Sequence, residues 1–167
     1  MEIGYYSIGK QISRYLPTFA AGIGAATGPL FAHINEANKT RLKVIFLKSF
    51  FGILVFYSLA CLVLLIFTKE IITLLYGTTY LNAVPMLRVL LIFILSFSVG
   101  SLISPQIDYL GLAKKRAIAI IIAIGLNIIL NLILIPKYGG LGAAIGTVAS
   151  YTPYTLYNLN TLWRALS

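Results

Sequence analysis

AIAIIIAIGLNIILNLILIPKYGGLGAAIGT, residues 117–147, is the stretch that decides the fold. Its first part, residues 117–136, carries only uncharged side chains. A helix of that length covers roughly 30 Å, which is the thickness of the hydrocarbon core of a bilayer. Every fourth residue within it is either small or an amide: Ala119, Ala123, Asn127 and Asn131. Because these side chains share one helical face and lipid offers no partner to an amide, we expect a membrane helix that packs on protein.

Composition places the whole chain in a membrane. Hydrophobic residues occupy 59% of the 167 positions and charged residues 10%, and the mean hydropathy is +0.93. A soluble domain of this size needs a larger polar surface. The single cysteine, Cys61, lies in an apolar run, which excludes a disulfide within one chain and a cysteine-based metal site. No metal and no cofactor is expected.

The charges are unevenly distributed, with 13 lysines and arginines against 4 aspartates and glutamates. The cations cluster at the ends of the apolar runs, which is typical of topology signals and of contacts to anionic lipids. We therefore expect membrane lipids, and no nucleic acid, as partners.

The apolar runs predict one all-α transmembrane domain over residues 1–167 with five spans. These spans cover about residues 5–34, 49–68, 85–107, 117–136 and 140–163, and residues 70–76 form a short interfacial helix that ends at Gly77. Small residues follow helical spacing in several spans. Gly24 and Gly28 form a GxxxG pair, and Ser96, Gly100 and Ser104 form a second stripe, both of which predict close approach of helices.

The segments between these spans predict the orientation of the chain. One side carries eight cations: Lys39, Arg41, Lys43, Lys48, Lys114, Lys115, Arg116 and Arg164. The other side carries three: Lys69, Arg88 and Lys137. The positive-inside rule therefore places the C-terminus in the cytoplasm and, with five spans, the N-terminus outside. Because no signal that would export this N-terminus is visible, we expect a further helix upstream.

Three stretches resemble the polysaccharide, O-antigen-type flippases of lipid-linked oligosaccharides. The first is EIGYYS at residues 2–7, and the second is IITLLYGTTYLNAVPMLR at residues 71–88. The third combines NIILN at residues 127–131 with IPKYG at 135–139 and GAA at 142–144. These flippases belong to the superfamily that also contains the multidrug-and-toxin exporters and the peptidoglycan-precursor flippase.

The resemblance implies a MATE-like fold of two six-helix lobes around a cavity that opens alternately to each side of the cell membrane. This chain would supply five helices of the C-terminal lobe, so the N-terminal lobe and one further helix are expected as an upstream or separate polypeptide. It also implies a transporter, not an enzyme, whose partner is a lipid-linked sugar.

Lys10 and Arg14 are the candidate substrate-binding residues. They lie at positions i and i+4 of the first span, with Gln11 alongside, so both cations project from one face. Ionisable groups inside a membrane usually face a cavity, and a paired Lys and Arg suits a phosphate by charge and geometry. The resemblance implies the same, because related flippases line their cavity with basic residues. The alternative is that both side chains extend to the outer interface as anchors.

Four further polar residues are candidates for the cavity or for helix packing. Asn127 and Asn131 suit contacts to neighbouring helices, and alternatively hydrogen bonds to glycan hydroxyls. Tyr151 and Tyr154 lie in the middle of the last span, where aromatic rings can stack on sugars. Asp108 is expected to pair with the cations at residues 114–116 across a short loop.

Three alternatives to a glycan flippase stay open. A drug or metabolite exporter of the same superfamily would share the fold. A membrane enzyme is disfavoured because the chain has one histidine, one aspartate and no metal-binding spacing. A truncated membrane fragment that transports nothing is the third.

Overall fold

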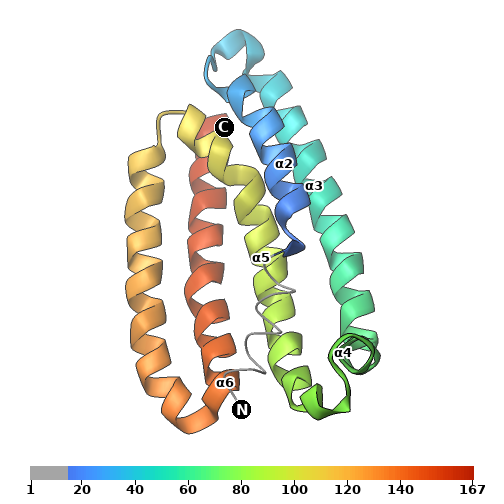
Figure 1. Ribbon diagram of the computed structural model, residues 1–167. Helices are drawn as coiled ribbons and strands as arrows, with labels where there is room; N and C mark the ends of the chain where they lie inside the picture. The colour runs from blue at the N-terminus through green and yellow to red at the C-terminus, as the bar shows by residue number, and fades with distance from the viewer. Residues whose placement is uncertain (1–14) are drawn as a thin grey trace.

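The computed structural model describes residues 15–167, apart from the side chain of Glu36, and every regular element in this part is a helix. The elements in chain order are α2 (Thr18–Thr27), η1 (Gly28–Phe31), α3 (Glu36–Ile66), α4 (Thr68–Tyr76), η2 (Thr78–Ala83), α5 (Val84–Tyr109) and α6 (Ala113–Leu166). The predicted all-α class is confirmed. Figure 1 shows α2 and α3 on one side of α5 and the two halves of α6 on the other.

Helix α6 is broken at Gly139, where the backbone has φ 55° and ψ −135°. This conformation is accessible to glycine and strained for other residues. The break divides α6 into a first arm, residues 113–138, and a second arm, residues 140–166, which run side by side in opposite directions (Figure 1). The break lies between the spans predicted at about residues 117–136 and 140–163, so the predicted separation of these two spans is confirmed.

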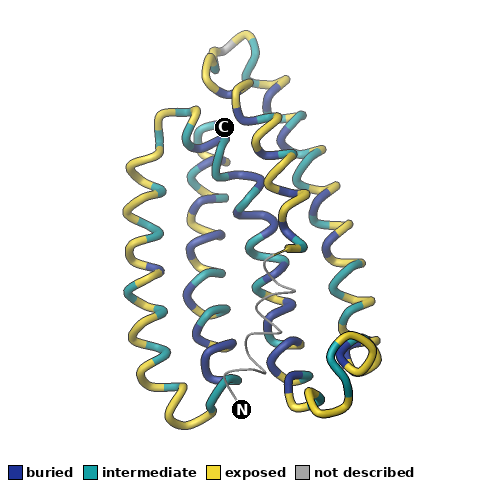
Figure 2. The backbone as a smooth tube through the Cα atoms, viewed as in Figure 1, coloured by how far each residue is buried: buried dark blue, intermediate teal, exposed yellow. Residues whose placement is uncertain are grey.

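Helix α5 forms the centre of the bundle and supplies more of the buried hydrophobic residues than any other helix in the described part of the chain. Figure 2 colours much of its backbone as buried. Six hydrophobic side chains of α5 are at most 1% exposed: Leu87, Leu90, Ile94, Leu102, Ile103 and Ile107. Its neighbours approach closely through glycines. A Cβ atom at Gly24 of α2 would lie 2.6 Å from the Ser101 carbonyl oxygen, and one at Gly28 would lie 2.9 Å from Pro105 Cβ. The close approach predicted from the GxxxG pair is confirmed.

Three helical segments are long and apolar enough to cross a membrane: Ala37–Ile66, Thr78–Tyr109 and Ala113–Leu166. Thr18–Phe31 is a shorter apolar helix. The chain is therefore an all-α membrane protein with several spans, and the number of five crossings stays a prediction. Helix α3 begins well before the predicted span at residues 49–68, because Asn35 and Asn38 close its N-terminus with reciprocal side-chain hydrogen bonds.

The charged segments separate to opposite ends of the bundle. The start of α3, the loop between α5 and α6, and the C-terminus lie at one end (Figure 1). Two contacts hold this end together: Lys43 Nζ lies 4.5 Å from the centre of the Trp163 ring, and Arg116 pairs with Asp108. We call this the basic end, defined by Lys39, Arg41, Lys43, Lys114, Lys115, Arg116 and Arg164. Helix α4, the start of α5 and the Gly139 turn lie at the other end.

Candidate functional site

A relay of side-chain hydrogen bonds joins the two arms of α6. Asn131 Nδ2 donates to Asn127 Oδ1 at 3.0 Å, and Asn127 Nδ2 donates to Ser150 Oγ at 3.1 Å. The Ser150 hydroxyl in turn donates to the Gly146 carbonyl at 2.8 Å. Gly146 also leaves room for this relay, because a Cβ there would lie 2.5 Å from Asn131 Oδ1. Both amides therefore make helix–helix contacts.

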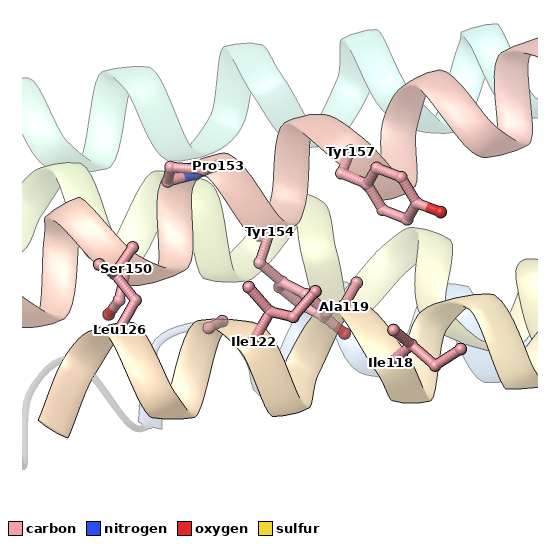
Figure 3. A pocket seen from close by; sticks show the side chains of 9 residues that line it. Ile118, Ala119, Ile122, Leu126, Ser150, Pro153, Tyr154 and Tyr157 are labelled. Carbon is pink, nitrogen blue, oxygen red and sulfur yellow. The ribbon is translucent and has the colours of Figure 1, made fainter. Parts of the chain in front are cut away.

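A pocket of about 270 Å³ lies between the arms beside this relay (Figure 3). Its lining is mostly aliphatic and comes from both arms: Ile118, Ala119, Ile122, Ala123 and Leu126, and then Ser150, Pro153, Tyr154 and Tyr157. It extends from Leu126 and Ser150 at one end to Ile118 and Tyr157 at the other. Ala119 and Ala123 belong to the predicted stripe of small residues and amides, which thus faces the second arm along its length.

Tyr151 and Tyr154 contribute to an aromatic cluster between α5 and the second arm. The Tyr151 ring lies 5.2 Å from Phe93, 5.3 Å from Phe97 and 5.0 Å from Tyr154, measured between ring centres. The Tyr151 hydroxyl also packs at the position of Gly100, where a Cβ would lie 3.3 Å from it. Tyr151 is thus part of the packing between α5 and α6, and Tyr154 reaches the pocket.

An ion pair closes the basic end between α5 and α6. Arg116 Nε and Nη2 donate to the two carboxylate oxygens of Asp108, each at 2.7 Å. The same guanidinium interacts with the Tyr154 side chain in the pocket wall. The expected pairing of Asp108 with the cations at residues 114–116 is confirmed, and Arg116 is the cation involved. Fork-to-fork geometry of this kind fixes the relative positions of both helices.

Three amide side chains have buried atoms without a hydrogen-bond partner within the described residues, and one of these atoms is Oδ1 of Asn131 in the relay. Gln106 is 0% exposed and donates from Nε2 to Thr27 Oγ1 at 3.1 Å, while its Oε1 has no partner in residues 15–167. Asn158 is 1% exposed, and neither its Nδ2 nor its Oδ1 has a partner there. It follows Tyr154 by four residues, so both lie on one face of the second arm. The periodicity of the sequence does not indicate that Gln106 or Asn158 is buried.

The structure places the predicted site residues in different parts of the molecule. Asn127, Asn131 and Tyr154 gather between the arms of α6, and Tyr151 packs against α5. Lys10, Gln11 and Arg14 lie outside the described residues. In residues 15–167 there is no group of three or more His, Cys, Asp or Glu side chains that could hold a metal ion. The pocket itself was not predicted, although its small lining residues were noted as a stripe.

Comparison with known proteins now identifies the family, because residues 1–133 match the family described as MatE. The chain belongs to the MatE family. Membership confirms the predicted resemblance at the level of the superfamily of exporters and flippases. No solved structure matches it significantly.

Three curated relatives are similar to this MatE chain. Two are uncharacterized membrane proteins of Methanocaldococcus jannaschii, which are 27% and 32% identical over 148 residues each, covering 88% and 87% of the chain and 29% and 34% of the relatives. The third is the "Probable low-salt glycan biosynthesis flippase Agl15" of Haloferax volcanii, 24% identical over 173 residues, which cover 96% of the chain and 34% of that protein. The MatE chain therefore spans about a third of the length of its curated relatives.

Proposed function

We propose that this MatE chain is part of a flippase that moves a lipid-linked oligosaccharide or polysaccharide precursor across the cell membrane. The observation that carries the proposal is the likeness, over 96% of the chain, to a protein named as a glycan biosynthesis flippase. The multi-helix apolar bundle suits such a role, because a bundle of packed membrane helices can move as one body against another.

The proposed mechanism is alternating access with a cationic cavity. In it, Lys10 and Arg14 hold the phosphate that links the glycan to its lipid, by charge and by forked hydrogen bonds. The close glycine contacts of α2 with α5 and the bonded arms of α6 support movement of these helices as one body. The partner half would come from the N-terminal lobe that these transporters require.

The test replaces Lys10 and Arg14 singly by alanine in the complete protein, expressed in cells that lack their own copy. The readout is surface glycan together with the amount of protein in the membrane. A matched control is Lys69→Ala, because Lys69 is an exposed cation on α4 at the other end of the bundle. We expect the first two variants to lose export and the control to keep it. Unchanged export in both Lys10 and Arg14 variants at normal protein levels would refute the cationic site.

The proposed orientation places the basic end and the C-terminus in the cytoplasm. Cys61 is the single cysteine, so a Cys61→Ala background leaves no native thiol in this chain. Single cysteines then replace Lys115 at the basic end and Lys137 at the opposite end. In intact cells, a membrane-impermeant maleimide should label position 137 and leave position 115 unlabelled until the membrane is opened. The reverse pattern would invert the orientation.

A further inference from the structure

Two of the three polar side chains that line the pocket between the arms of α6, Ser150 and Tyr154, interact with other groups of the protein. Ser150 Oγ accepts from Asn127 and donates to the Gly146 carbonyl, and Tyr154 interacts with Arg116. In Figure 3 the Tyr157 hydroxyl points away from the Ser150 end of the pocket. The remaining surface consists of Ile, Leu, Ala and Pro side chains. An occupant of this pocket is therefore apolar.

The size and depth of the pocket suit a lipid chain. Its volume of about 270 Å³ is below the roughly 300–1,000 Å³ that encloses a drug-sized ligand, so it takes a segment of a longer molecule. From Ile118 to Leu126 the first arm rises about 12 Å, and one leaflet supplies about half of the 30 Å hydrocarbon core. The pocket thus matches the chain region of a single leaflet.

Two lysines stand one helical turn from the pocket, towards the basic end. Lys114 precedes Ile118 by four residues and Lys115 precedes Ala119 by four, so each lysine shares a helical face with a residue of the lining. Both side chains are exposed, and Asp108, the described carboxylate next to them in the chain, is bound by Arg116. An anionic headgroup at the interface complements these charges.

We propose that this pocket binds one acyl chain of an anionic phospholipid, whose phosphate contacts Lys114 and Lys115. The site lies between the arms of α6, and the proposal assigns it none of the substrate cations of the first predicted span. It is thus a lipid site in addition to the substrate path, and its test does not depend on transport. The neighbouring Arg116 stays with Asp108 and positions the loop that carries both lysines.

The experiment uses the full-length protein in phosphatidylcholine vesicles with a trace of phosphatidylglycerol that carries a diazirine on its acyl chain. After illumination, mass spectrometry locates the adducts. We expect them on residues 118–126 and 150–157, and we expect unlabelled phosphatidylglycerol to compete better than phosphatidylcholine. Adducts spread evenly along the exposed face of the first arm, for example at Leu132, would overturn the proposal. So would a polyprenyl phosphate that competes better than phosphatidylglycerol, because the site would then belong to the substrate lipid.

Matched variants test the two halves of the site separately. Ala119→Phe fills the pocket and should lower the adduct yield about fivefold, whereas Ala117→Phe adds the same ring to an exposed residue outside the lining and should leave it unchanged. Replacing Lys114 and Lys115 together by alanine should reduce the preference for the anionic lipid about tenfold, and Lys137→Ala at the opposite end should not. Equal yields in Ala119→Phe and Ala117→Phe, or a preference unchanged by the lysine variant, would overturn the assignment. If a variant fails to fold, the competition between phosphatidylglycerol and phosphatidylcholine in the unmodified protein tests the proposal.

Discussion

Asn127 and Ser150 bind the two arms of α6 to each other through a hydrogen bond of 3.1 Å from Asn127 Nδ2 to Ser150 Oγ. The bond lies between residues that the Gly139 turn brings together, and Asn131 supports it from the next helical turn. Each described member of the relay donates to the next, and the last donates to a backbone carbonyl. The contribution of Asn127 to stability can be compared with that of Asn158, a buried amide that has no hydrogen-bond partner in residues 15–167.

Asn127→Leu should lower the stability of the protein by about 1 kcal/mol, the usual value of a side-chain hydrogen bond between membrane helices. Asn158→Leu makes the same chemical change at a site where the described residues offer no hydrogen bond. It should raise stability by about 1–3 kcal/mol, because it removes a buried amide that has no partner. Thermal unfolding in detergent measures both. A loss of stability in Asn158→Leu would show that this amide binds a group beyond residues 15–167.

Gly24→Ala should destabilise the packing of α2 on α5. The added methyl group would lie 2.6 and 2.7 Å from the carbonyl oxygens of Ser101 and Leu102, which are backbone atoms that cannot rotate away. Overpacking of this kind costs about 1–3 kcal/mol. Gly22→Ala is the matched control, since nothing lies within 4 Å of a Cβ there, and it should gain up to about 1 kcal/mol of helix propensity. Equal melting temperatures for the two variants would contradict the close contact.

Gly139→Ala should strain the turn between the arms. At φ 55° and ψ −135° a side chain costs about 1–3 kcal/mol. Gly125→Ala provides the control, because Gly125 lies inside the first arm with open space around its Cβ position. Thermal unfolding should separate the two variants in opposite directions. A tolerant Gly139→Ala would mean that the turn adopts another conformation in the protein.

The Asp108–Arg116 pair should contribute only modestly to stability, because the two side chains are 37% and 29% exposed. A double-mutant cycle of Asp108→Asn and Arg116→Gln should give a coupling energy below about 1 kcal/mol. That coupling should shrink further in 1 M salt, where charges are screened over about 3 Å. A coupling of several kcal/mol that resists salt would show that residues outside the described part bury the pair.

The elements of the fold could be predicted from the sequence because each depends on local pattern and on the thickness of the bilayer. The 117–136 run, the turn at Gly139 and the stripe from Ala119 to Asn131 need only helical periodicity and the behaviour of glycine. The pairing of Asp108 with Arg116 needs only a short loop between opposite charges. These features can therefore be predicted from the sequence.

The remaining features depend on how helices rotate against one another. Gln106 bonds to Thr27, which lies 79 positions away in the chain, and no local pattern links them. The pocket exists because Ala119 and Ala123 are small where they face Pro153 and Tyr154, and this register follows from packing. The packing role of Tyr151 could not be predicted for the same reason, because its ring packs against Phe93 and Phe97 of a different helix.

The break at Gly139 also has a consequence for the synthesis of the protein. The first arm leaves the ribosome earlier than the second, so Asn127 and Asn131 reach the membrane before Gly146 and Ser150 reach it. Lipid offers these amides no hydrogen bonds, but a single-residue break keeps the second arm at high effective concentration. Both arms are therefore expected to insert as one helical hairpin, and in the proposed orientation Lys137 is the charge that crosses the membrane with it.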